Sequence, residues 1–253
     1  LAEKVSQFKL AFAPFAIPEP EIFPSAPEHY RLRAEFRIWH QDERLDYAMF
    51  DPENPKQPVM VEHFPMAAES ICALMPRLLE RLRVSQTLRG GLFQADFLAT
   101  LSGELMVTLI YHRQLGSGWE LAARDLAADL NIQVIGRSRG QKVVLDRDWL
   151  LEEFELNGRR LRYQQIEGSF TQPNGGVNRQ MLGWACQQAA GIGGNLVELY
   201  CGNGNFTIAL APLFDKVLAT EVSKSSVHAA QYNIAANDIE NVVLVRASSA
   251  EIS

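Results

Sequence analysis

Residues 196–206 read Leu-Val-Glu-Leu-Tyr-Cys-Gly-Asn-Gly-Asn-Phe, an apolar strand that stops in a glycine-rich loop. Glu221 closes the next apolar segment, seventeen residues after Gly204. Glycines let a loop backbone approach a ligand closely, and an acid at the end of the following strand can accept hydrogen bonds from ribose hydroxyls. This order of strand, glycine loop, helix and acid predicts a parallel α/β sheet that binds a nucleoside cofactor.

The glycine loop also has simpler interpretations. Gly202 and Gly204 could serve only a tight strand-to-helix turn, and Glu221 could be a solvated strand end. The loop lacks the third glycine of the dinucleotide fingerprint, which disfavours an NAD-dependent oxidoreductase. A cofactor without pyrophosphate fits better, and S-adenosylmethionine is the common candidate. We expect Tyr200 and Asn205 beside its methionine end and Glu221 on its ribose, with the backbone of Gly202 close to it.

The residues around this loop alternate between helices and strands. We expect helices at 174–190, 206–213 and 224–237, and strands at 196–200, 216–221 and 242–245. Pro173 is expected in the first turn of the first of these helices. The alternation implies right-handed crossovers and a doubly wound, Rossmann-like sheet. Because the chain ends at Ser253, three strands into that sheet, we expect it to be a fragment with an incomplete cofactor-binding domain.

The first part of the chain has a different pattern. From Tyr30 to Trp39 apolar and polar residues alternate, which is typical of a half-buried strand. We expect further strands at 45–50, 92–101, 105–112, 133–137 and 142–145, and helices at 5–12, 65–84 and 119–130. Pro76 should kink or interrupt its helix. The prediction is an α+β domain with a mostly antiparallel sheet over residues 1–165, followed by the α/β domain over residues 166–253.

Composition limits the function classes. The chain has 253 residues, is 47% hydrophobic and carries a net charge of −6, which argues against binding nucleic acid by bulk charge. Local basic clusters remain, such as Arg31, Arg33 and Arg37 on one side of the first strand, although a solvated strand face would look the same. No apolar run approaches the roughly 20 residues of a membrane span, and no signal peptide is evident, so we expect a cytoplasmic protein.

The cysteines predict neither disulfides nor a metal centre. Cys72, Cys186 and Cys201 are odd in number and widely spaced, unlike a disulfide framework or a zinc or iron–sulfur site. Cys72 and Cys186 fall among apolar residues, where packing is the simplest role. Cys201 lies in the glycine loop and is expected to line it without a chemical role.

Four motifs carry a resemblance to a known family. They are His29–His40 (HYRLRAEFRIWH), Ser169–Asn174 (SFTQPN), Leu199–Phe206 (LYCGNGNF) and Ala229–Asn237 (AAQYNIAAN). Together they closely resemble the bacterial tRNA (uracil-5-)-methyltransferase family over essentially the whole chain. The first motif points to the tRNA branch of the wider group of RNA uridine-5 methyltransferases.

The resemblance implies a reaction and a set of site residues. The enzyme would transfer a methyl group from S-adenosylmethionine to C5 of the T-loop uridine of tRNA, with transfer-messenger RNA as a further candidate substrate. Gln172, otherwise an incidental helix cap, would contact the cofactor together with Tyr200, Asn205 and Glu221. Phe170 would stack on a base, unless it is a buried aromatic at the domain boundary. The arginines Arg31, Arg33 and Arg37 would contact phosphates of the T-arm.

The family chemistry needs residues that this sequence does not contain. In the family a cysteine thiolate adds to uracil C6, C5 then attacks the methyl group, and a glutamate removes the C5 proton. The flipped-out base must reach the pocket. The nucleophile's Ser-Cys-Asn-Pro motif does not occur before Ser253, so we predict no catalytic nucleophile in this chain. The alternative is a non-catalytic RNA-binding module with a degenerate cofactor fold.

Overall fold

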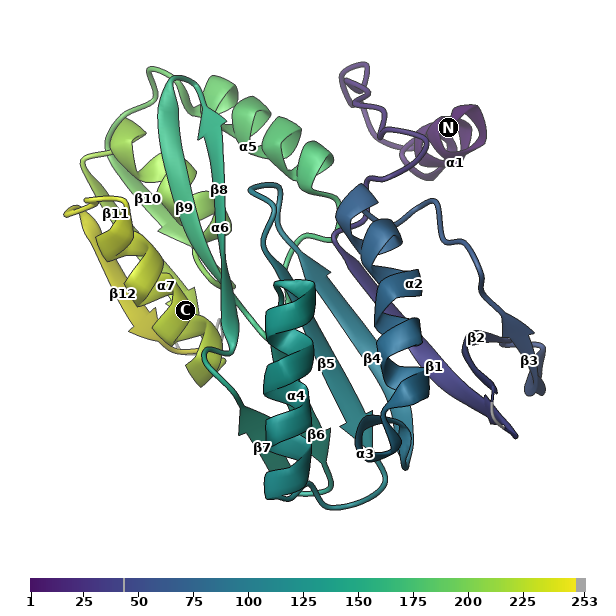
Figure 1. Ribbon diagram of the computed structural model, residues 1–253. Coiled ribbons are helices and arrows are strands. Elements are labelled where there is room, and N and C mark those ends of the chain that lie inside the picture. Colours follow the sequence, from purple (N-terminus) through teal and green to yellow (C-terminus); the bar gives the residue numbers. More distant parts are fainter. Residues whose placement is uncertain (43, 249–253) are drawn as a thin grey trace.

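A seven-stranded sheet forms the largest unit of the computed structural model, which describes residues 1–42 and 44–248 (Figure 1). Its strands are β1 (Arg33–Gln41), β2 (Arg44–Asp51), β3 (Asn54–Met60), β4 (Leu92–Ala99), β5 (Leu105–Tyr111), β6 (Gln133–Ser138) and β7 (Gln141–Val144). They follow the order β3-β2-β1-β4-β5-β6-β7, and every neighbouring pair is antiparallel except β5 with β6. The mostly antiparallel sheet predicted for the first part of the chain is confirmed.

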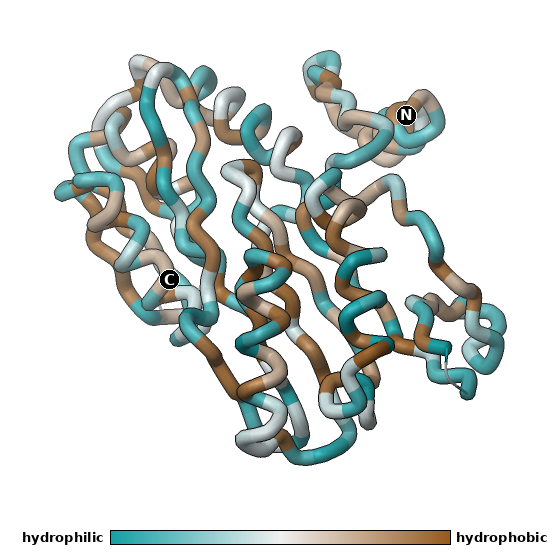
Figure 2. The backbone as a smooth tube through the Cα atoms, in the orientation of Figure 1, coloured by the Kyte–Doolittle hydropathy of each residue, from teal (hydrophilic) through white to brown (hydrophobic). Residues whose placement is uncertain are grey.

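Helices cover one face of this sheet. Figure 1 shows α2 (Glu69–Val84) and α4 (Ser117–Leu130) lying across it, with the short α3 (Gln86–Arg89) between them. Figure 2 shows hydrophobic segments along β4 and β5 and hydrophilic ones on the outward turns of the helices. The apolar residues that alternate along the first strand, Leu32, Ala34, Phe36 and Ile38, are all buried beneath the helices. The pattern therefore identified the core face of β1 correctly.

Two segments that contain prolines differ from the prediction. Helix α2 begins at Glu69 rather than at residue 65, and it runs through Pro76 to Val84 without interruption. Its buried residues are Ile71, Leu74, Met75, Leu78, Leu79 and Leu82. Burying one such side chain contributes roughly 1.5–3 kcal/mol, so the set outweighs the roughly 3 kcal/mol that an interior proline costs. Strand β3, which contains Pro55 and Pro58, was not predicted, and it tolerates them because it is an edge strand.

A hairpin that was not predicted joins the two halves of the molecule. It consists of β8 (Trp149–Leu156) and β9 (Arg159–Ile166), which pair antiparallel. At one end Leu150 packs with Leu98, Met106 and Ile135 of the large sheet. At the other end Phe154, Leu161 and Tyr163 pack with Leu182, Cys186 and Ile208. Because the hairpin contacts both halves, the division at residue 165 stays a prediction.

The second sheet is parallel. Its strands β10 (Asn195–Glu198), β11 (Lys216–Glu221) and β12 (Val242–Arg246) lie in that order. The helices in this region are α5 (Gly175–Ala189), α6 (Asn205–Leu210), a 3-10 turn at Ala211–Leu213, and α7 (Lys224–Ala236). This is the Rossmann-like arrangement that the alternation predicted. The edge strand β10 is shorter than expected, and its Val197 is 57% exposed.

The start of α5 corrects a further expectation. Pro173 does not occupy the first turn of the helix. Asn174 caps α5 instead, and its side chain accepts a hydrogen bond from the Val177 N–H at 2.9 Å. Before this region, the chain begins with α1 (Ala2–Ala11), which buries none of its residues. Among the described residues, no helix has the length and apolar character needed to cross a membrane.

Candidate functional site

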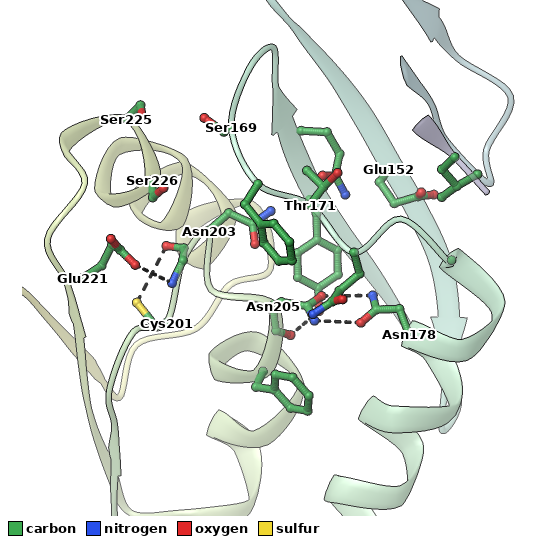
Figure 3. A pocket seen from close by; sticks show the side chains of 18 of the residues that line it. Glu152, Ser169, Thr171, Asn178, Cys201, Asn203, Asn205, Glu221, Ser225 and Ser226 are labelled. Atoms are coloured by element: carbon green, nitrogen blue, oxygen red, sulfur yellow. Dashed lines mark hydrogen bonds between the residues drawn. The ribbon is translucent and has the colours of Figure 1, made fainter. Parts of the chain in front are cut away.

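A cavity of about 510 Å³ lies between the glycine loop, the segment 168–175 and the β8–β9 hairpin (Figure 3). All five predicted cofactor residues line it: Gln172, Tyr200, Gly202, Asn205 and Glu221. Its volume falls within the roughly 300–1,000 Å³ usual for small-molecule sites. Three separate segments of the chain therefore bring the predicted residues to one cavity.

The glycine loop has an unusual backbone. Tyr200, Gly202 and Gly204 have φ angles of 58°, 59° and 84°, all in the left-handed region. Glycine adopts this conformation freely, whereas a bulky residue such as Tyr200 is strained there. Such strain is found most often at functional sites. The loop then passes through Gly204, the N-cap of α6.

Glu221 holds this loop to the end of β11. Its side chain is buried, and its carboxylate accepts hydrogen bonds from three backbone N–H groups, those of Gly202 (3.0 Å), Val222 (2.9 Å) and Ser223 (2.7 Å). The interpretation of Glu221 as a solvated strand end is therefore wrong. Oε2 accepts only the bond from Gly202 among these three, which leaves it able to accept one from a hydroxyl group in the cavity.

Asn205 is held by a residue that the sequence analysis missed. The amide groups of Asn178 on α5 and Asn205 on α6 exchange two hydrogen bonds, of 2.8 and 3.1 Å (Figure 3). The Tyr163 hydroxyl also donates to the Asn205 carbonyl oxygen at 3.1 Å. Because each amide uses one donor and one acceptor in the exchange, Asn205 keeps a second N–H and a second lone pair for a ligand.

A second missed asparagine supports the loop from α7. Asn233 is fully buried, and its side chain donates to the Asn203 carbonyl oxygen at 2.9 Å while accepting from the Gln164 N–H at 2.6 Å. It thereby joins the glycine loop to β9. The signal was present in the sequence, because Asn233 lies inside the 229–237 motif and an asparagine in a helix interior usually needs a specific partner.

Two acids have raised pKa values, Glu152 in the wall of the cavity and Glu198 on β10, the strand that leads into the glycine loop. Burial raises the pKa of Glu152 on β8 to about 7, although both of its carboxylate oxygens accept from the Leu101 N–H at 3.0 Å. Burial likewise raises the pKa of Glu198 on β10 to about 7, and the Thr207 hydroxyl donates to it at 2.6 Å. Both groups therefore change protonation close to neutral pH.

The cysteines are not activated. Burial raises the pKa of Cys201 to about 12, with Glu198 and Glu221 adding to the effect. Burial also raises the pKa of Cys72 and of Cys186. Since the thiolate is the nucleophile, these environments disfavour covalent chemistry at all three. In the described part of the chain, no group of three His, Cys, Asp or Glu side chains is arranged to hold a metal ion.

The predicted RNA-binding residues divide between two hollows. Arg31 and Arg33 line a hollow of about 540 Å³ next to the main cavity, and Phe170 lines both. Arg33 donates to the Ser169 carbonyl oxygen at 2.7 Å, which ties it to the same segment. Phe170 is 75% exposed, so the interpretation as a buried boundary aromatic is wrong.

Arg37 lies apart from this group, farther along β1. It lines a hollow of about 680 Å³ with Trp39 and Phe93. Its guanidinium carbon lies 3.8 Å from the centre of the Phe93 ring, and the centre of the His112 ring lies 4.1 Å from the centre of the Phe93 ring. Phe93 and His112 were not predicted. A cation beside accessible aromatic rings is a surface that suits both phosphates and unstacked bases.

The chain is similar to a family of known proteins. A family model described as tRNA (Uracil-5-)-methyltransferase matches residues 1–253. The chain is 74% identical over 253 residues to proteins from Aromatoleum aromaticum and Dechloromonas aromatica named tRNA/tmRNA (uracil-C(5))-methyltransferase, and 52% identical over 256 residues to one of the same name from Acinetobacter baylyi. Each alignment covers 100% of this chain and 69%, 70% and 71%, respectively, of those proteins.

A solved structure shares the fold. The Pyrococcus abyssi tRNA (uracil-54, C5)-methyltransferase in complex with S-adenosyl-L-homocysteine aligns with a TM-score of 0.72 at 16% identity. The alignment covers 97% of this chain and 62% of the Pyrococcus abyssi chain. The chain therefore spans less than two thirds of that structure.

Proposed function

The chain belongs to the tRNA (uracil-5-)-methyltransferase family, and we propose that it binds S-adenosylmethionine in the 510 Å³ cavity for methyl transfer to C5 of a T-arm uridine in tRNA. The observation that carries the proposal is the convergence of Gln172, Asn205 and Glu221 on one cavity. Gln172 comes from the segment before α5, whereas Asn205 and Glu221 come from one strand–helix–strand unit, and the fold brings all three to the same cavity.

The chemistry of the cavity suits this cofactor. S-adenosylmethionine supplies an electrophilic methyl group on a sulfonium ion. Glu221 Oε2 accepts from a ribose hydroxyl, and the spare N–H and lone pair of Asn205 suit the carboxylate and ammonium groups of a methionine moiety. Tyr200 and Gln172 line the same cavity, and the backbone of Gly202 permits close approach of the ligand.

The RNA would lie along the sheet face that α2 and α4 leave uncovered. Phe170 offers an exposed ring at the mouth of the cavity, where an extruded base can stack. Arg31 and Arg33 would contact phosphates beside it, and the Arg37–Phe93 pair extends the surface along β1. We propose both tRNA and transfer-messenger RNA as substrates, and a cytoplasmic location, where both RNAs are found.

The alternative is a non-catalytic RNA-binding module with a degenerate cofactor fold. The hydrogen bonds that fix Glu221 and Asn205 and leave each with capacity for a ligand support a working cofactor site instead. The nucleophile belongs to the family's Ser-Cys-Asn-Pro motif, and none of Cys72, Cys186 and Cys201 lies in that motif or is activated. The residues described here would therefore hold the cofactor and the RNA.

Methyl transfer from labelled S-adenosylmethionine to an unmodified tRNA transcript tests the proposal. The natural full-length protein should produce 5-methyluridine in the T-loop and bind S-adenosylhomocysteine in calorimetry. A transcript with cytidine in place of the target uridine serves as the control. Absence of both methylation and ligand binding would contradict the proposed function, whereas ligand and RNA binding without methylation would favour the non-catalytic module.

A further inference from the structure

The inner face of the β8–β9 hairpin changes from apolar to polar at its centre. Side chains alternate along a strand, and the register pairs Leu150 with Gln165, Glu152 with Tyr163, and Phe154 with Leu161 on one face. Leu150 packs on the large sheet, and Phe154 and Leu161 pack on α5 and α6. Between these clusters Glu152 and Gln165 are diagonal neighbours, and both line the 510 Å³ cavity.

Gln165 has an unsatisfied buried acceptor. Its Oε1 atom is buried and has no hydrogen-bond partner among the described residues. The other polar groups on this face are occupied, because Glu152 accepts from the Leu101 N–H and the Tyr163 hydroxyl donates to Asn205. Native proteins satisfy nearly all buried polar atoms, and an unsatisfied one costs about 1–3 kcal/mol. The side chain that lines the cavity therefore has an acceptor available for a ligand that donates a hydrogen bond.

The position of Gln165 separates it from the proposed cofactor residues. Figure 3 shows Glu221 on one side of the cavity and Glu152, the cross-strand neighbour of Gln165, on the other, with Asn205 between them. A nucleoside bound at Glu221 and Asn205 would leave the hairpin end of the cavity free. Phe170, an exposed residue, also lines the cavity and offers a stacking surface for a planar ligand.

We propose that Gln165 binds the N3–H edge of the target uracil in this end of the cavity, an inference that rests on the proposed function. Oε1 accepts from N3–H, and the Nε2 group donates to O4 of the base. Cytosine carries a lone pair at N3 and an amino group in place of O4, so the same orientation of the amide opposes it. Gln165 is thus a residue that determines specificity for uracil over cytosine.

The test compares Gln165→Met with wild type in the natural full-length protein. Methionine matches glutamine in length and removes both hydrogen bonds. Binding is measured for two T-arm RNA hairpins that differ only by uridine or cytidine at the target position, and for S-adenosylhomocysteine. We expect the wild type to prefer the uridine hairpin about tenfold and the variant less than about twofold, with unchanged S-adenosylhomocysteine affinity. Gln164→Met, adjacent on β9 with its side chain on the opposite face, should retain the wild-type preference.

Thermal melting without ligand separates binding from folding. If Oε1 is unsatisfied in the free protein, Gln165→Met should melt at the wild-type temperature or above it. If the variant melts lower, Gln165→Asn repeats the binding test, because it keeps the amide but withdraws it from the base. A wild-type preference that persists in the variants overturns the inference and leaves the proposed function intact. Failure of the wild type to bind either hairpin or S-adenosylhomocysteine contradicts the proposed function itself.

Discussion

Asn178 and Asn205 exchange two amide hydrogen bonds, 2.8 and 3.1 Å long, across the wall of the central cavity. This exchange fixes the orientation of the Asn205 amide, because each group presents its donor to the acceptor of the other. Asn178 is buried and belongs to α5, which follows the 169–174 motif, whereas Asn205 begins α6 after the glycine loop. The pair therefore joins the glycine-loop motif to the helix that follows the 169–174 motif.

Asn178→Leu should lower the affinity for S-adenosylhomocysteine about tenfold, because leucine preserves the volume but frees the Asn205 amide to rotate. Calorimetry measures the affinity, and Asn178→Asp, which keeps one acceptor, should give an intermediate loss. Gln180→Leu on the exposed side of α5 is the matched control. Unchanged affinity in Asn178→Leu would mean that Asn205 does not contact the cofactor through its side chain.

Glu221→Gln should weaken binding of S-adenosylhomocysteine at least about tenfold and lower the melting temperature. The carboxylate accepts from three backbone N–H groups, and glutamine would present an NH₂ group to at least one of them. Hydrogen bonds to a charged group contribute about 1.5–3 kcal/mol each. Glu240→Gln, an exposed substitution with the same change of charge, should alter neither quantity. A variant with wild-type melting and affinity would show that the loop does not depend on Glu221.

Stability should fall as the pH rises from 5 to 8, and Glu152 should contribute to the fall. Burial raises the pKa of Glu152 from 4.5 to about 7, so the folded state binds this proton more tightly than the unfolded state. Its stabilisation is complete below pH 4.5 and is lost as the pH rises through about 7. Over this range the free energy of unfolding should fall on the order of 2 kcal/mol more in the wild type than in Glu152→Gln.

Urea unfolding at several pH values measures the difference. Glu198 and Asp96 have pKa values raised by burial to about 7 and about 6, so the variant should keep a residual decline. Glu153→Gln, on the neighbouring strand position that faces the other way, is the control. Parallel pH profiles for the wild type and Glu152→Gln would contradict the assignment.

The sequence predicted the elements whose periodicity is strong and local. The alternation in β1 and the order of strands and helices after residue 166 depend on neighbouring residues, and both were correct. The β8–β9 hairpin was missed although Asn157-Gly158 lies between its strands with φ angles of 50° and 76°. Asn-Gly is the strongest short hairpin signal, so this prediction was available from the sequence.

The candidate site was predicted only in part, for a different reason. The glycine loop, Glu221 and the 169–174 motif are recognisable because their residue types and spacing serve a ligand directly. The partners Asn178 and Asn233 act through contacts with Asn205 and Asn203, 27 and 30 positions away. The unsatisfied acceptor of Gln165 depends on the packing of two apolar clusters around it. These contacts exist only in the folded chain, and of the three residues only Asn233, inside the 229–237 motif, has a signal in the sequence.

Arg37→Met should reduce the salt dependence of tRNA binding by about one unit in the slope of log K against log salt. Arg37 lies over the Phe93 ring on the sheet face opposite α2, and a phosphate contact there would release about one counterion. Adding Arg33→Met should lower the slope by a second unit. It should also weaken base binding, because Arg33 donates to the Ser169 carbonyl oxygen beside Phe170. Filter binding of a tRNA transcript at several salt concentrations measures both effects.

Arg81→Met is the matched control, since it removes the same charge from α2 on the opposite side of the sheet, where Arg81 pairs with Asp129. If only bulk charge mattered, replacing any of the three arginines would change RNA binding equally, because each carries one positive charge in a protein whose net charge is −6. A specific RNA surface predicts that Arg81→Met leaves the slope unchanged while Arg37→Met lowers it. Equal slopes for Arg37→Met and the wild type would contradict a phosphate contact on this part of β1. They would not contradict the proposed cofactor site.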